Sequence, residues 1–111
     1  MKKGKDRRRF NGAFVVLGKG MLFQCQEWRT LSLAARSLYI LLKGKYTGSN
    51  NGGLCVSYSE AMRYGGLKSS QTVSRCFKEL EVKDWIKATE RGGLFRRPTK
   101  YQLTGTFDKH L

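Results

Sequence analysis

Apolar side chains recur at helical spacing between residues 31 and 42 and predict the first regular element of the chain. Ser32 stands just before this pattern and is a favourable N-cap residue, so a helix is expected from Leu33 to about Tyr46. The segment 46–53 is rich in glycine and asparagine, which favour turns and positive φ, and it ends the helix. This helix is expected to be mainly a core element, buried through Leu31, Ala35, Leu38 and Leu42, with Ala34 and Leu41 beside them.

Two further helices are predicted downstream. Ser57 and Glu60 have the spacing of a capping box, in which each side chain accepts a hydrogen bond from the backbone amide of the other residue. This predicts a helix from Tyr58 to about Tyr64, stopped by the glycines at 65–66. The next helix is expected over about 70–81, because one apolar stripe recurs there at helical spacing: Val73, Cys76, Phe77 and Leu80.

Alternation of apolar and polar residues predicts two strands near the C-terminus. The alternation runs over 86–89 and again over 100–104, and the loop 91–98 between them carries three arginines and no acid. These segments predict an antiparallel hairpin over about 85–104. Asp84 stands where the preceding helix must turn, a position that aspartate tolerates well. The short run 54–56 is expected to be a strand that the hairpin could accept as its third.

The N-terminal part of the chain gives weaker patterns. Residues 1–9 hold six basic residues and one acid without apolar periodicity, and we interpret them as a disordered arm. The apolar runs 14–17 and 21–23 favour short strands or extended segments packed on the core. One or two helical turns within 24–29 would make Trp28 a core anchor. Residues 10–111 are then a single domain, since two domains would each be too small to bury enough apolar surface.

The charge balance narrows the class of partner. The 111 residues include 22 Lys and Arg against eight Asp and Glu, a net charge of +14. Such an excess causes self-repulsion in the fold and is usually matched by an anionic partner. An RNA protein, a DNA binder and a peripheral membrane protein all fit this number. No apolar run is long enough to span a bilayer. The order of the predicted elements must decide between these partners, and it favours a nucleic acid and not a membrane.

Metal binding and catalysis are not indicated. The cysteines are far apart and the single histidine is close to residue 111, whereas a structural zinc site needs four ligands, mostly in close pairs. The odd number of cysteines argues against a disulfide framework and fits a reducing cytosol. No motif of a phosphate loop, nucleophile elbow or metalloprotease is present, so we predict neither an enzyme nor a cofactor. The neighbouring acids Glu79, Glu81 and Asp84 are interpreted as a solvated acidic turn.

The polar face of the predicted helix 70–81 carries side chains that match DNA. Arg75 can bind O6 and N7 of guanine, and Gln71 can bind N6 and N7 of adenine. Lys78, one turn further on, is expected to contact a phosphate. The remaining candidates are short hydroxyl donors suited to phosphates or to either base: Ser69, Ser70, Thr72 and Ser74. The alternative interpretation is a solvated polar helix surface.

The hairpin supplies a second set of candidate contacts, which would follow a phosphate strand or enter a minor groove. These are Lys87, Arg91, Arg96, Arg97 and Lys100. An alternative is that the charges only discourage edge-to-edge aggregation of exposed strands. Trp28, Trp85 and the tyrosines could stack on single-stranded bases, although their apolar neighbours favour core packing.

The order of these motifs resembles the winged-helix DNA-binding domains of prokaryotic regulators and of phage and plasmid replication initiators. The resemblance spans roughly residues 21–104. Its main motifs are Ser57-x-Ser59-Glu60-Ala61-x-x-x-Gly65, Ser69-x-x-Thr72-Val73-x-Arg75-x-x-x-x-Leu80 and Trp85-Ile86. Two upstream motifs are also similar to small helix-turn-helix proteins of bacterial mobile elements: Trp28-x-x-Leu31-Ser32 and Tyr46-x-Gly48-x-Asn50-Asn51-Gly52-Gly53. It implies that 69–78 is a recognition segment and 87–100 a wing. Two departures from the pattern are a longer turn between the two helices and Asp84 in place of the usual glycine.

The sequence therefore predicts an α+β fold of the winged helix-turn-helix type, with about three core helices and a small antiparallel sheet. The helix-turn-helix covers about 57–81 and the wing about 85–104. The expected function is sequence-specific binding of double-stranded DNA, in transcription control or at a replication origin, in the cytoplasm with the nucleoid. Homodimerisation is left open. The alternatives are a binder of RNA or single strands and a protein-interaction module.

Overall fold

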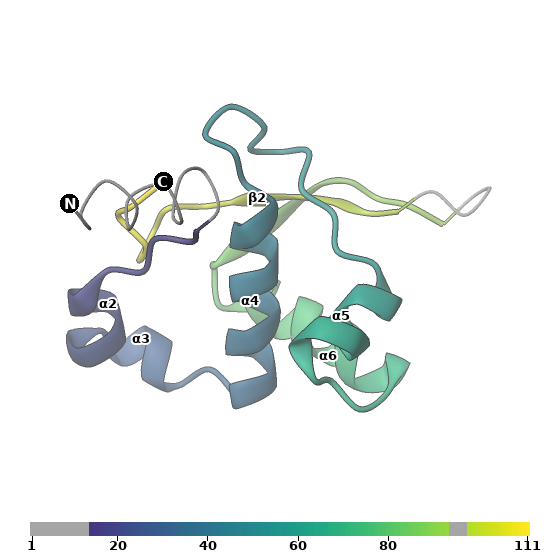
Figure 1. The fold of residues 1–111 in the computed structure, drawn as a ribbon, viewed down its shortest axis with the longest axis horizontal. Helices are drawn as coiled ribbons and strands as arrows, with labels where there is room; N and C mark the ends of the chain where they lie inside the picture. The colour runs from purple at the N-terminus through teal and green to yellow at the C-terminus, as the bar shows by residue number, and fades with distance from the viewer. Residues whose placement is uncertain (1–13, 94–97) are drawn as a thin grey trace, which may run out of the picture.

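The central element of the fold is helix α4 (Leu33–Lys45), around which the other elements are arranged (Figure 1). The computed structural model describes residues 14–93 and 98–111. Within these residues α4 follows the short helices α2 (Lys19–Gln24) and α3 (Gln26–Arg29). After it come, in chain order, α5 (Tyr58–Gly65), α6 (Ser70–Val82), β1 (Ile86–Glu90) and β2 (Lys100–Leu103). These five helices and the two-stranded antiparallel sheet make an α+β fold.

The prediction for α4 is confirmed. Ser32 is the N-cap residue, and its hydroxyl accepts a hydrogen bond from the amide of Ala35 at 3.1 Å. Ala35, Leu38 and Leu42 are fully buried, as the helical spacing required. Two further residues of α4, Tyr39 and Lys43, are also buried, so the helix is covered on more sides than its apolar stripe indicated.

Three aromatic rings from distant parts of the chain meet against α4. Trp28 of α3, Tyr39 of α4 and Trp85 just before β1 contact one another edge to face, with ring centroids 5.3–5.9 Å apart. Such pairs contribute about 0.5–1.5 kcal/mol each beyond the burial of their area. Trp28 is the predicted core anchor. Because both tryptophans are buried, neither ring is free to stack on a nucleic-acid base.

The N-terminal segment differs from the prediction. Residues 14–17 form no strand and expose Phe14, Val15 and Val16, while residues 21–23 belong to helix α2. Met21 faces the core, whereas Phe23 is 75% exposed. A run of only three or four apolar residues is too short to show a helical or a strand period. Its secondary structure was therefore decided by tertiary packing.

Helices α5 and α6 begin and end at the predicted signals. Both hydrogen bonds of the capping box between Ser57 and Glu60 are present, and Gly66 ends α5 in the left-handed region at φ 73°. Such a φ suits glycine because it has no Cβ. The predicted stripe of α6 is buried and packs toward α4 and α5: Val73, Cys76, Phe77 and Leu80.

The hairpin has the predicted strands and an antiparallel register. Ile86 pairs with Leu103 and Ala88 with Tyr101, and a bulge follows Ala88. The segment 54–56 joins the sheet through one bridge only, in which Leu54 and Tyr101 exchange two backbone hydrogen bonds of 3.1 and 2.8 Å. Asp84 makes the preceding turn with φ 65°, in agreement with the prediction.

The C-terminal residues, for which the sequence predicted no element, close the core. Asp108 is buried and forms an ion pair of 2.7 Å with the buried Lys43. The hydroxyl of Tyr39 donates to the same carboxylate, and Lys43 also donates to the carbonyl of Val16. The tail packs closely enough that a Cβ on Gly18 would lie 2.7 Å from the ring of His110. The segments 14–18 and 105–111 are thus both held against α4.

Replacing Phe77 with alanine tests the orientation of α6. The ring is 6% exposed and stacks on Tyr101 at 4.8 Å, so its loss should lower the free energy of unfolding by about 3–5 kcal/mol. Tyr58→Ala is the matched control, because that ring also stacks on Phe77, at 6.2 Å, but is 42% exposed. Urea denaturation of both variants measures the difference. Equal losses would mean that Phe77 does not lie in the core.

Acid should unfold the protein partly through Asp108. Burial raises the pKa of this carboxyl, but the hydrogen bonds from Lys43 and Tyr39 outweigh it and hold the pKa below its usual value. The folded pKa therefore lies below the unfolded value of about 3.9, and the stabilisation is complete above that pH and lost as the pH falls through the folded pKa. Asp108→Asn should cost about 3–5 kcal/mol near neutral pH, since Lys43 then keeps a buried charge without its partner.

Thermal denaturation between pH 2 and 7 checks this prediction. The gap between the wild-type and Asp108→Asn melting temperatures should be constant above about pH 5 and should close toward pH 2. The double variant Lys43→Met with Asp108→Leu should recover part of the loss, because it leaves no unpaired charge. A gap that does not change with pH would show that the ion pair is not the source of the stability.

Candidate nucleic-acid interface

The face of α6 opposite its buried stripe is exposed and polar. Ser70, Gln71, Ser74, Arg75 and Lys78 are all exposed, and the last two carry positive charge. Gln71 and Arg75 are four residues apart, about one turn of helix, so they share this face. The structure therefore brings together on one surface five of the side chains that the sequence singled out.

The first turn of α6 uses two of the predicted contact residues for its own capping. The hydroxyl of Ser69 accepts from the amide of Thr72 at 3.2 Å and lies 3.1 Å from the hydroxyl of Thr72. Both side chains are only partly exposed. An N-cap contributes about 1 kcal/mol to a helix, so these hydroxyls have a local role whether or not they also contact DNA.

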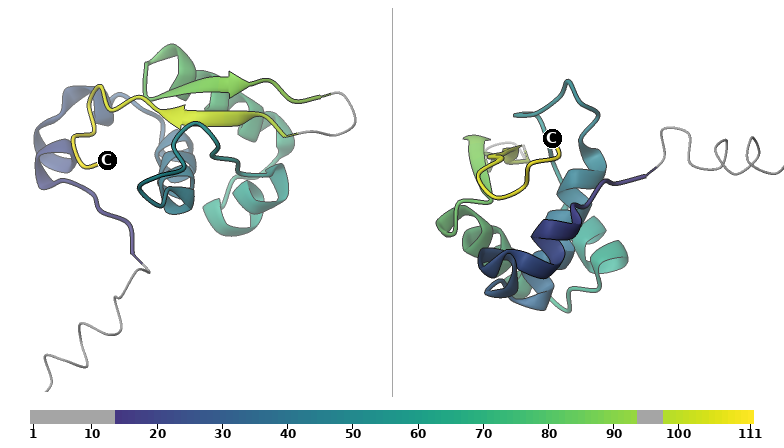
Figure 2. Two further views of the ribbon diagram at one scale, coloured as in Figure 1. Left: turned by 90° about the horizontal axis from the view of Figure 1, so that it is seen from above. Right: turned by 90° about the vertical axis from the view of Figure 1, so that its left-hand side faces the viewer.

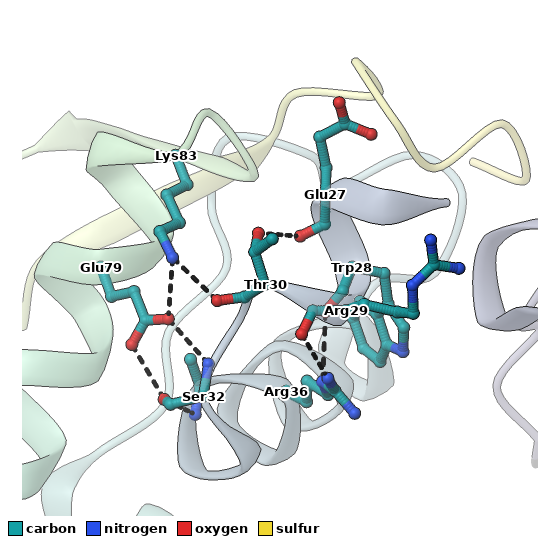
Figure 3. Close-up of polar contacts among 9 residues, drawn as sticks. Glu27, Trp28, Arg29, Thr30, Ser32, Arg36, Glu79 and Lys83 are labelled. Atoms are coloured by element: carbon teal, nitrogen blue, oxygen red, sulfur yellow. Dashed lines mark hydrogen bonds and ion pairs between the residues drawn. The ribbon is translucent and has the colours of Figure 1, made fainter. Parts of the chain in front are cut away.

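Glu79 fixes α6 against the beginning of α4 (Figure 3). Its carboxylate accepts hydrogen bonds from the amide and the hydroxyl of Ser32, both at 2.8 Å. Lys83 completes the joint, because its ammonium group lies 3.6 Å from Glu79 and donates to the carbonyl of Thr30 at 2.9 Å. Burial raises the pKa of Glu79, but the bonds from Ser32 and Lys83 outweigh it and the pKa is lowered.

The prediction of a solvated acidic turn is wrong for two of its three residues. The side chains of Glu79 and Glu81 are only 23% and 22% exposed and carry tertiary contacts. Asp84 is exposed and accepts a hydrogen bond from Thr106. Nothing in the local pattern could reveal the pairing of Glu79, because its partner Ser32 is 47 residues away.

Arg36 has a structural position in the same region. Its guanidinium donates to the carbonyls of Trp28 and Arg29 at 3.1 and 2.8 Å, and it lies over the ring of Trp28 (Figure 3). The guanidinium thus adds side-chain hydrogen bonds to two carbonyls at the end of α3, where fewer backbone amides are available; the carbonyl of Trp28 also accepts from the amide of Leu31 at 3.2 Å. Arg36 is therefore not a free cation of the surface.

The cations of the hairpin differ in whether an acidic side chain pairs with them. Lys87 is exposed and forms no ion pair with any residue that the structure describes. Lys100 lies 3.8 Å from Glu90, and Arg91 forms a two-point ion pair with Glu81. The sequence showed no acid inside the loop, but the fold brings Glu81 to Arg91 from α6. Arg96 and Arg97 lie outside the described residues, as does the arm 1–9.

A groove separates the exposed face of α6 from the hairpin. Its volume is about 710 Å³, and Ser74 and Lys78 border it on one side and Thr99 on the other. The stacked rings of Phe77 and Tyr101 lie against it. In two perpendicular views the hairpin extends from Ile86 toward residue 93 on the same side of α4 as α5 and α6 (Figures 1 and 2). The helix face and the hairpin thus border one surface.

Two exposed cations close to α6 in the chain were not among the predicted site residues. Arg63, near the end of α5, lies over the ring of Tyr64, and Lys68 follows in the turn before α6. Both are exposed and make no ion pair within the described part of the chain. Their place on either side of the glycines at 65–66, where α5 ends and the turn to α6 begins, is the signal that could have identified them.

Residues 14–93 and 98–111 contain no group of three or more histidine, cysteine, aspartate or glutamate side chains that could hold a metal ion. None of their helices is long and apolar enough to cross a membrane. All three cysteines are free thiols. Comparison of the chain with protein-family models, with curated proteins and with solved structures gave no match.

Glu79→Gln should loosen the joint that orients α6. An amide offers one acceptor where the carboxylate offers two, so one bond from Ser32 is lost and the free energy of unfolding should fall by about 1–2 kcal/mol. Glu27→Gln is the matched control, since Glu27 is an exposed acid whose side chain contacts only the thiol of Cys25. Urea denaturation compares the two. An equal loss of stability in the two variants would mean that the hydrogen bonds between Ser32 and Glu79 do not stabilise the fold.

Proposed function

We propose that this chain is a winged helix-turn-helix protein that binds double-stranded DNA in a sequence-specific manner. In this proposal α6 is the recognition helix in the major groove, and the β1–β2 hairpin is the wing on the backbone. The observation that carries the proposal is the shared surface: the exposed polar face of α6 and a basic hairpin border one groove. A helix fits the major groove of about 12 Å, and a neighbouring hairpin then reaches a phosphate strand.

The distribution of charge supports a polyanionic partner. In the described residues five acids form ion pairs: Glu60, Glu79, Glu81, Glu90 and Asp108. Several exposed cations of α5, α6, the turn between them and β1 have no described acidic partner: Arg63, Lys68, Arg75, Lys78 and Lys87. Most of the described acids are thus paired within the fold, whereas these cations keep their charge, and Lys78 lines the groove. Phosphates would relieve the repulsion between these cations and release counterions.

The residues of α6 fit the roles that base reading requires. Arg75 and Gln71 can each bind one base through two hydrogen bonds, and their common face lets both reach the same groove. Lys78, further along the helix beside the hairpin, suits a phosphate. The proposal includes a role in transcription control or at a replication origin. The protein would act in the cytoplasm of a prokaryote, encoded by its genome or by a mobile element.

A protein-interaction module is the second candidate. Leu33 and Val82 are 77% and 74% exposed. A cleft of about 590 Å³ lies between the start of α4 and α6, and its lining includes Ala34 and Val82 beside polar and charged residues. Exposed apolar side chains around such a cleft are a common feature of protein contacts. This candidate predicts no binding to any nucleic acid, which the experiment below tests.

Arg75→Ala and Lys87→Ala should separate base reading from backbone binding. Arg75→Ala should cost about 1–3 kcal/mol on a duplex selected by the wild-type protein and should reduce the preference at one base position. Lys87→Ala should weaken binding to every duplex similarly and lower the slope of log affinity against log salt by about one unit. Titrations with selected and scrambled duplexes at several salt concentrations measure both effects.

The controls use the opposite side of the molecule and other nucleic acids. Lys19→Ala removes an exposed charge from α2, across α4 from α5 and α6, and should change binding less than Lys87→Ala (Figure 1). Single-stranded DNA and RNA of the same sequences should bind more weakly than the duplex. Equal loss on both duplexes for Arg75→Ala would make α6 a phosphate contact and not a reader. Absence of binding to all three probes would favour the protein-interaction module.

A further inference from the structure

Glu81 and Arg91 form a two-point ion pair that joins the last turn of α6 to the hairpin. Nη2 of Arg91 lies 2.7 Å from Oε1 of Glu81, and Nη1 lies 3.3 Å from Oε2. This fork-to-fork arrangement is the strongest geometry available to an arginine and a carboxylate. The side chain of Glu81 is 22% exposed, whereas that of Arg91 is 69% exposed. We call this pair the Glu81–Arg91 clasp.

The clasp lies in the groove between α6 and the hairpin. Both of its side chains line this groove together with Ser74, Lys78 and Thr99. The field of the carboxylate extends to the neighbouring ring, since burial first and then the charge of Glu81 raise the pKa of Tyr101 to about 12. A phosphate strand that contacted both α6 and the hairpin would pass this carboxylate.

We propose that Glu81 is a positioning residue that withholds Arg91 from the DNA backbone and so limits sequence-independent binding. The inference rests on the proposed function and adds a residue that limits how tightly the protein binds DNA. While the clasp is closed, Arg91 contributes no net charge to the groove, and a phosphate must displace a carboxylate that is already hydrogen-bonded at two points. A chain with a net charge of +14 thereby binds arbitrary duplexes less tightly than its cations would allow.

The pair between Lys100 and Glu90 provides the matched comparison on the same hairpin. Its single contact is 3.8 Å long, and both side chains are about half exposed. Lys100 is therefore already free to exchange Glu90 for a phosphate, and removal of Glu90 should release little. Glu81→Gln and Glu90→Gln each change the net charge by +1, so a difference between them reflects the clasp and not the overall charge.

The experiment measures the affinity of the full chain for a selected and a scrambled duplex at several salt concentrations. Glu81→Gln should bind both duplexes about three- to tenfold more tightly and steepen the salt dependence by about one unit, because Arg91 can then neutralise a phosphate. The ratio between the two duplexes should stay unchanged. Glu90→Gln should give less than half of this gain. In an Arg91→Ala background Glu81→Gln should no longer steepen the salt dependence.

Three outcomes would overturn the inference while the proposed function stands: equal effects of Glu81→Gln and Glu90→Gln, no tighter binding by Glu81→Gln, or a steeper salt dependence that persists without Arg91. Thermal denaturation of each variant confirms that it is folded, and Glu81→Ser replaces Glu81→Gln if the amide variant is not. Failure of the wild-type protein to bind any duplex would overturn the proposed function and, with it, this role of Glu81.

Discussion

The hydrogen bonds from Ser32 to the carboxylate of Glu79 fix α6 against the first turn of α4. The side chain of Ser32 thus caps α4 and, through Glu79, orients α6, whose opposite face is exposed. The direction in which Gln71 and Arg75 point depends on this joint as well as on the buried stripe of α6, since a stripe alone permits sliding and rotation. Because charged hydrogen bonds are directional, the joint can select one arrangement among several that bury similar area.

The same use of acidic side chains recurs through the fold. Asp108 holds both ends of the described chain against α4 through Lys43, and Glu60 caps α5 while pairing with Lys45. In a protein with 22 basic and eight acidic residues, this leaves many exposed cations without a described acidic partner, Arg75, Lys78 and Lys87 among them. Which cations remain unpaired is therefore a consequence of where the acids are engaged.

The exposed cations of α6 and of the hairpin are of three kinds, which differ in how firmly they are paired. Arg75 and Lys87 are exposed without a described acidic partner, Lys100 is loosely paired, and Arg91 is held at two points by Glu81. A polyanion would meet the free cations first, since long-range attraction depends on net charge, and would meet the paired ones only at close contact. If the proposed function holds, base reading and backbone affinity are governed by different residues and can be altered separately.

The sequence alone determined those elements whose signals are local. The cap at Ser32, the capping box of Ser57 and Glu60, the stripe of α6 and the alternation in β1 and β2 each involve residues within a few positions, so the helices α4, α5 and α6 and the hairpin were predicted almost to their ends. The exposed face of α6 followed from its stripe. Only the tertiary structure decided that 21–23 is helical, that Asp108 is buried, and that Glu79 and Glu81 contact Ser32 and Arg91. These outcomes depend on partners up to 69 residues apart, and a pattern of neighbouring residues carries no information about such pairs.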